Sequence, residues 1–181
     1  FGVCRTMNLQ DNDFELFQLP RRQQLDLAEL DQRWKTLQRQ VHPDRFVAQG
    51  AAAQRVAMQW SVRINEAYQR LKDPLKRAAY LCELGGVPVE AHSNTAMPAD
   101  FLMQQMEWRE ALDDAEDAGA LQALACEVQQ ASSDALQEVT AAIDTQQDMP
   151  AAAALVRRMM FIQKFAQEVR QRQLQQQLQQ S

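Results

Sequence analysis

Residues 26–44 read DLAELDQRWKTLQRQVHPD, and this stretch decides the fold. Asp26 is a good helix N-cap, and Glu29, three residues later, completes a capping-box pattern. Apolar residues then recur at spacings of three and four, which predicts one buried stripe on a helix. The stripe consists of Leu27, Leu30, Trp34, Leu37 and Val41. Pro43 stops the helix, because proline disfavours helical backbone at the preceding His42.

A second long helix is expected after a loop of small and polar residues at 44–50. Its apolar face consists of Ala53, Val56, Trp60, Ile64, Ala67 and Leu71, and Asp73 with Pro74 ends it. Two long helices with matching stripes and a short connection predict an antiparallel hairpin. Short helices are expected on either side, at 13–19, which Pro20 ends, and around 75–81, which Gly85 and Gly86 end.

The remainder of the chain indicates a separate helical bundle. Weak periodicity predicts a linker at 85–97, and three helical stretches follow at 99–118, 121–145 and 151–175. Short connections between three helices predict a three-helix bundle, and the Gln-rich end, 171–181, is expected to fray. With no convincing strand alternation, the fold class is all-α. The expected parts are an extension at 1–10, a hairpin domain at 11–84, the linker at 85–97 and the bundle at 98–181.

Composition excludes several classes of function. The net charge of −5 argues against a general nucleic-acid binder, and no apolar run approaches the length of a membrane span. Three scattered cysteines and two histidines fit no familiar zinc spacing. With no phosphate-binding Gly loop and no nucleophile paired with His, we expect no enzyme, no metal and no cofactor. A helical enzyme that uses Asp44, Glu107 or Glu110 is the disfavoured alternative.

His42, Pro43 and Asp44 form the most informative tripeptide, because the hairpin must expose the loop that they begin. Pro43 fixes the local backbone, and the Asp44 carboxylate can bind an arginine bidentately. Lys35 and Arg39 lie opposite the buried stripe, and Arg33 flanks them. This basic strip suits an acidic partner, although an ordinary solvated face is the simpler explanation of the charges alone.

The first bundle helix carries more apolar surface than its core requires. Phe101, Trp108, Leu112 and Ala115 form its core stripe, whereas Leu102, Met103 and Met106 point elsewhere beside Glu107 and Glu110. In the last helix, Phe161 lies off the core stripe, which consists of Leu155, Met159, Ile162, Ala166 and Val169. Met-rich patches adapt to partner surfaces, so the patch either binds a partner or packs against the linker or the hairpin.

Residues 64–68, INEAY, followed by Leu71, Asp73, Pro74, Arg77 and Tyr80, make the segment 11–84 resemble a J-domain. This resemblance implies that the chain docks on a DnaK-type chaperone and stimulates its ATPase, whose chemistry belongs to the partner. His42, Pro43 and Asp44 are then the contact loop. Lys35 and Arg39, with Arg33 beside them, are then the electrostatic docking face.

A J-domain joined to a three-helix bundle is similar to the HscB family of iron–sulfur co-chaperones. Residues 101–110, FLMQQMEWRE, resemble that family's scaffold-binding helix. The resemblance implies delivery of the scaffold protein IscU to the chaperone HscA, and it implies six scaffold contacts: Leu102, Met103, Met106, Glu107, Glu110 and Phe161. Eukaryotic members carry paired cysteines in an N-terminal zinc module, whereas this region holds Cys4 alone, so the chain resembles the bacterial type. The three scattered cysteines indicate reduced thiols in a cytoplasmic protein. A J-domain protein that serves a different client is the alternative.

Overall fold

The computed structural model describes residues 6–90 and 97–181, and every regular element in these ranges is helical. The chain divides into two compact units, one ending at Leu81 and the other beginning at Cys82. The division falls inside a helix, three residues before the expected end of the hairpin domain. The expected extension at 1–10 and linker at 85–97 lie partly outside the described residues. No described helix is long and apolar enough to cross a bilayer.

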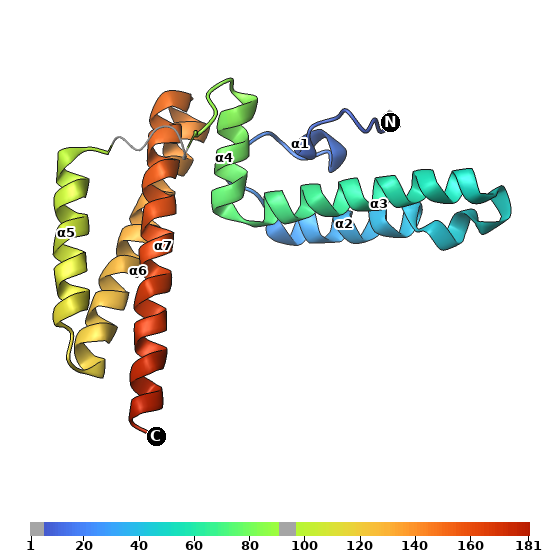
Figure 1. Ribbon diagram of the computed structural model, residues 1–181. Helices are drawn as coiled ribbons and strands as arrows, with labels where there is room; N and C mark the ends of the chain where they lie inside the picture. The colour runs from blue at the N-terminus through green and yellow to red at the C-terminus, as the bar shows by residue number, and fades with distance from the viewer. Residues whose placement is uncertain (1–5, 91–96) are drawn as a thin grey trace. The chain divides into compact units, whose positions relative to one another are not determined.

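The first unit is built on a helical hairpin (Figure 1). Its elements are α1 (Asp13–Leu16), α2 (Leu27–Val41), the 3-10 segment η1 (Pro43–Gln49), α3 (Ala51–Lys72) and the start of α4 (Pro74–Leu84). The side chain of Asp26 caps α2 by accepting hydrogen bonds from the backbone N–H groups of Ala28 at 3.0 Å and Glu29 at 3.2 Å. The predicted start of this helix and the predicted antiparallel hairpin are both confirmed.

Two residues of the predicted hairpin stripes are exposed, and four others are only half-buried, namely Trp34, Leu37, Ala53 and Trp60. Leu30, Ile64 and Leu71 are fully buried, but Leu27 is 48% exposed and Val56 is 51% exposed. Leu27 is the first residue of α2, at the end of the predicted stripe. Near the hairpin tip α3 packs against η1 as well as α2, and there Ala57, not Val56, is the buried residue. The predictions of burial for Leu27 and Val56 were therefore wrong.

The short first helix also ends earlier than the predicted 13–19. Gln18 adopts a φ of 53°, and the backbone N–H of Leu19 donates to the carbonyl of Phe14 at 2.9 Å. Such a left-handed residue with a bond back across the last turn terminates a helix. Phe14 and Phe17 are buried as expected, and the Phe14 ring stacks on Tyr80.

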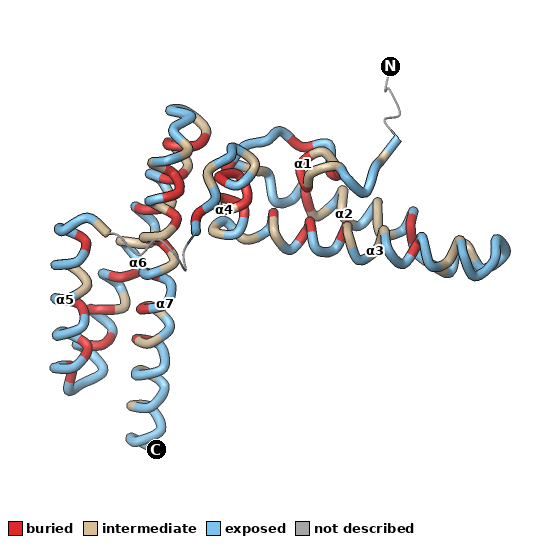
Figure 2. Tube along the Cα trace, turned by 45° about the horizontal axis from the view of Figure 1, so that its top comes forward, coloured by how far each residue is buried: buried red, intermediate tan, exposed pale blue. Residues whose placement is uncertain are grey.

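The second unit is a three-helix bundle, confirming the predicted fold class. Its helices are α5 (Ala99–Asp114), α6 (Ala118–Thr140), which continues as the π-helical segment η2 (Ala141–Thr145), and α7 (Met149–Gln179). Figure 2 shows buried residues along the sides of these helices that face one another. The predicted core residues Phe101, Trp108, Leu112 and Ala115 are buried. Val156 and Phe165 of α7 are buried as well, although the predicted stripe omitted them.

Two predicted helix boundaries in the bundle were wrong. The first helix was expected to reach 118 and the second to begin at 121, but α5 ends at Asp114 and α6 begins at Ala118. Asp117 sets this boundary, because its side chain accepts a bond from the N–H of Ala120 at 2.7 Å.

The Gln-rich end does not fray, since α7 runs to Gln179. Gln173 Nε2 donates to Gln122 Oε1 at 3.3 Å, and Gln176 Nε2 donates to the carbonyl of Glu116 at 3.3 Å. These side-chain amides tie the last turns of α7 to α6 and to the residues just before it. The sequence pattern missed them because they join positions far apart in the chain.

Candidate partner-binding sites

The His-Pro-Asp loop lies at the turn between α2 and α3, at the end of the hairpin (Figure 1). His42 ends α2 with an extended ψ of 129°, and Pro43 begins η1. The ring nitrogen Nδ1 of His42 accepts a hydrogen bond from the backbone N–H of Asp44 at 3.3 Å. The side chains of His42 and Asp44 are 58% and 87% exposed. The loop is therefore held by a local bond while its carboxylate faces solvent, which is the exposure that a contact role requires.

The basic strip on α2 is partly neutralised within the hairpin. Lys35 Nζ lies 2.9 Å from the Asp31 carboxylate, one turn earlier in the helix. Hydrogen bonds from Lys35 and from Tyr68 hold the pKa of Asp31 below its usual value. Arg39 is exposed, and no carboxylate pairs with it within the described part of the chain. Arg39 is therefore the cation of the strip with the most freedom to meet a partner.

Arg33 has a structural task in addition to any docking role. Its guanidinium pairs with Glu29 and donates to the carbonyls of Phe17, at 2.7 Å, and Gln18. These bonds tie the end of α1 to α2. Arg33 was predicted as a flank of the docking face, and its contact with a partner stays a prediction.

The predicted apolar patch on the bundle is exposed. The exposed fractions are 46% for Leu102, 63% for Met103, 68% for Met106 and 45% for Phe161. Glu107 and Glu110 are exposed beside them. The patch therefore has the solvent access that partner binding requires, although the role of each residue stays a prediction.

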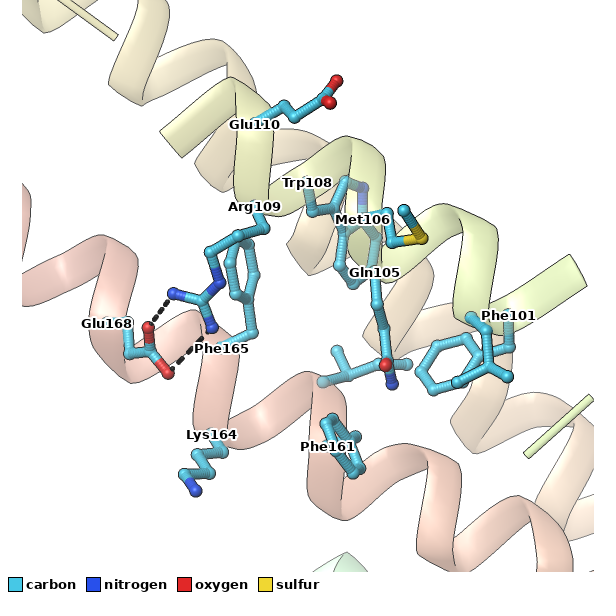
Figure 3. A pocket seen from close by; sticks show the side chains of 12 residues that line it. Phe101, Gln105, Met106, Trp108, Arg109, Glu110, Phe161, Lys164, Phe165 and Glu168 are labelled. Atoms are coloured by element: carbon cyan, nitrogen blue, oxygen red, sulfur yellow. Dashed lines mark hydrogen bonds and ion pairs between the residues drawn. The ribbon is translucent and has the colours of Figure 1, made fainter. Parts of the chain in front are cut away.

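A groove of about 560 Å³ runs between α5 and α7 (Figure 3). Four of the six predicted scaffold contacts line it, namely Leu102, Met106, Glu110 and Phe161. The other two, Met103 and Glu107, lie outside its lining.

Aromatic rings lie between the two helices: Trp108 stacks on Phe165 with ring centroids 5.5 Å apart, and Trp108 Nε1 donates to Glu127 at 3.2 Å.

Phe161 is less detached from the bundle than expected. Its ring meets Phe101 edge to face, with centroids 6.4 Å apart and planes at 87°. Its place off the predicted core stripe requires no bundle contact, but the structure gives it one. Phe161 is therefore partly packed against the bundle, and it also lines the groove.

Sequence reasoning missed several residues that complete the groove: Gln105, Arg109, Lys164, Phe165 and Glu168. Arg109 of α5 and Glu168 of α7 form an ion pair across it (Figure 3). The pair lowers the pKa of Glu168 and raises that of Arg109. These two residues are 59 positions apart, so no local spacing pattern could have revealed them.

The described residues hold no group of three or more His, Cys, Asp or Glu side chains placed to bind a metal ion. Cys4 and His92 lie outside the described residues. The expectations of no metal and no cofactor therefore stay predictions.

The chain combines a helical hairpin that ends in an exposed loop with a helical bundle that carries a groove. This combination defines a class of all-α proteins with an N-terminal J-type domain and a C-terminal bundle. Two solved structures share this architecture. HscB from Vibrio cholerae matches with a TM-score of 0.78 and 36% identity, covering 91% of this chain and 99% of its own. Human co-chaperone HscB matches with a TM-score of 0.84 and 26% identity, covering 94% and 87%.

Sequence comparisons give the family. Residues 97–170 match the model of the HSCB C-terminal oligomerisation domain. The co-chaperone protein HscB homologue of Bordetella pertussis is 50% identical over 160 residues, which is 88% of this chain and 94% of the relative. The homologue of Paraburkholderia phytofirmans is 48% identical over 165 residues, covering 90% and 94%. The chain belongs to the HscB family of co-chaperones, as the resemblance implied.

Proposed function

We propose that this co-chaperone stimulates the ATPase of a DnaK-type chaperone, HscA, and delivers the iron–sulfur scaffold protein IscU to it. The observation that carries the proposal is the presence of two exposed candidate sites on different compact units. One is the loop with His42 and Asp44, and the other is the apolar patch around Leu102 and Met103. Membership of the HscB family supports both roles.

The hairpin supplies the chaperone contact in this proposal. The Asp44 carboxylate, 87% exposed, offers two oxygens to an arginine of the chaperone, the strongest geometry for such a pair. Lys35 and Arg39 attract an acidic surface and orient it on α2, where Arg39 carries the larger share because Asp31 offsets Lys35.

The bundle supplies the scaffold contact. Leu102, Met103, Met106 and Phe161 offer apolar area, and flexible methionines adapt to the surface that covers them. Glu107 and Glu110 add acidic groups beside this area, which favour a basic surface on the scaffold.

The chain itself then catalyses no reaction and needs no cofactor. It raises the effective concentration of the client near the ATPase by carrying both sites on one polypeptide. Hydrolysis takes place on HscA, in the cytoplasm.

The test is the steady-state ATPase rate of HscA with the full-length chain, with and without IscU. His42→Gln should abolish stimulation, while circular dichroism and IscU affinity stay unchanged. Gln49→Ala, at the exposed end of the same segment, is the matched control and should stimulate fully. Equal loss of stimulation and IscU affinity in His42→Gln contradicts separate sites. Stimulation without any complex with IscU indicates a J-domain protein that serves a different client.

A further inference from the structure

Gln105 places an amide in the largely apolar groove between α5 and α7. Its side chain projects from α5 toward α7, with the amide beside the rings of Phe101 and Phe161 (Figure 3). The Nε2 atom is shielded from solvent, and no acceptor in the described ranges, 6–90 and 97–181, bonds to it.

Gln105 is half-buried as a residue, and its donor has no partner among the described residues of the free chain. A shielded amide donor that has given up its bond to water and gained none in return is costly, and native proteins contain few such groups. A leucine or methionine has a similar size and no donor to satisfy. Packing alone therefore does not explain a glutamine at a position whose neighbours Phe101 and Ile162 are each 1% exposed.

We propose that Gln105 is a recognition residue of the groove, and that its Nε2 donates a hydrogen bond to a main-chain carbonyl of the client segment that enters between α5 and α7. This inference rests on the proposed function, because the client is the scaffold protein. This hydrogen bond adds a directional polar contact to a surface that otherwise binds through apolar area and charge.

A neutral carbonyl is the acceptor that the site favours. Burying an ionised carboxylate among apolar side chains costs far more than burying a carbonyl, and Glu110 on the groove lining repels a second negative charge. The carbonyl must also be free. Carbonyls inside a helix already accept bonds from their own helix, so the entering segment is a loop, the edge of a sheet or the last turn of a helix.

Side chains at the mouth of the groove can make room for this segment. Met106 is 68% exposed and Phe161 is 45% exposed, so both can rotate away from the amide. An apolar side chain next to the bonded carbonyl then fills the space beside Leu102 and Met106, and a cationic side chain meets Glu110.

The experiment measures IscU binding by calorimetry and the melting temperature for two variants of the full-length chain. Gln105→Leu should keep or raise the melting temperature yet weaken IscU binding about tenfold, the effect of losing one buried hydrogen bond. Gln104→Leu, the neighbouring glutamine outside the groove lining, is the matched control and should change neither. If Gln105→Leu lowers the melting temperature, Gln105→Met replaces it as the closer match in shape.

A second readout uses the wild-type chain. The side-chain amide of Gln105, followed by ¹⁵N NMR, should shift on addition of IscU and exchange more slowly with water. Unchanged IscU affinity in Gln105→Leu, or an unmoved Gln105 signal in a wild-type chain that binds IscU, overturns this inference and leaves the proposed function standing. A wild-type chain that stimulates HscA but does not bind IscU overturns both.

Discussion

The carboxylate of Asp13 is fully buried and accepts a hydrogen bond at 2.8 Å from Arg63, 50 residues later in the chain. Its second oxygen lies 3.2 Å from Nη1 of Arg70. The backbone N–H of Asp13 donates to the hydroxyl of Tyr80 at 3.0 Å. Asp13 thereby ties the short helix α1 to both α3 and α4. These contacts lie away from the His-Pro-Asp loop at the tip of the hairpin.

Asp13→Asn should therefore destabilise the first unit. The change leaves Arg63 and Arg70 facing a neutral amide, and breaking a buried ion pair of this kind costs about 3 kcal/mol in the free energy of unfolding. This cost lies at the low end of the range for broken buried ion pairs, because Arg63 and Arg70 are 21% and 40% exposed and water offsets part of the loss. Urea unfolding followed by circular dichroism measures the change.

Glu66→Gln is the control for Asp13→Asn. Glu66 lies on the exposed face of α3, where loss of a carboxylate should leave the unfolding midpoint within error. If both variants unfold with the wild-type midpoint, the buried carboxylate contributes no net stability.

The helices and the exposed sites were predictable because they depend on short-range periodicity. Apolar spacing of three and four placed α2 and α3, and a capping aspartate marked the start of α2. The same geometry placed Leu102, Met103 and Met106 off the core stripe of α5, and all three are exposed. These features need only the helical repeat, which the sequence contains locally.

The remaining features depend on contacts that the repeat does not encode. Leu27 and Val56 have the correct spacing, but Leu27 begins its helix, and α3, which carries Val56, packs against η1 as well as α2. The pairs Asp13 with Arg63 and Arg109 with Glu168 join helices far apart in the sequence. Gln105 was missed for a related reason, because part of its surroundings, Phe161 and Ile162, comes from α7.

The hydroxyl of Tyr68 donates to Asp31 at 2.8 Å, and this bond raises the pKa of Tyr68. Burial raises the pKa of Tyr80, the other tyrosine of the chain. Asp31→Asn should therefore lower the pKa of Tyr68 toward its ordinary value and leave Tyr80 unchanged. Ultraviolet absorbance during an alkaline titration measures both groups, and Tyr68→Phe identifies the signal that belongs to Tyr80.

The raised pKa values of Tyr68 and Tyr80 also fix the sign of a stability change. A raised pKa in the folded state means that the neutral phenol is favoured there. The stability that the neutral phenol contributes is fully present below the unfolded pKa of about 10. It is lost as the pH rises through the pKa of the folded state. The wild type should therefore lose more stability than Tyr68→Phe across this alkaline range. An equal loss in both contradicts a role for the Tyr68 bond.

The apolar patch should separate binding from stability. Leu102→Ala with Met103→Ala removes exposed side chains, so IscU binding should weaken while the melting temperature stays constant. Phe161→Ala should weaken binding and also lower stability by about 1 kcal/mol, because the ring loses its edge contact with Phe101. Calorimetry and thermal unfolding measure the two quantities.

Leu174→Ala is the matched control for the patch. Leu174 is 59% exposed on α7 but lies outside the lining of the groove, so neither IscU binding nor stability should change. A large fall in melting temperature for the Leu102 and Met103 double variant would show instead that these side chains support the bundle.

Two cysteines in the described part of the chain should differ sharply in reactivity. Cys82 is buried and Cys126 is exposed. Burial raises the pKa of the Cys82 thiol to about 11, so at pH 8 it stays protonated and lacks the thiolate that attacks a disulfide reagent. In a Cys4→Ser background, Ellman's reagent should rapidly label one thiol per folded chain, that of Cys126.

Cys126→Ser in the same background should abolish that rapid phase, and full labelling should then require urea. The slow reaction of Cys82 reports opening of the segment that buries it, so its rate should rise with denaturant before Cys82 becomes fully reactive in the unfolded chain. Fast labelling of Cys82 without denaturant would mean that this thiol is open to solvent in the native protein.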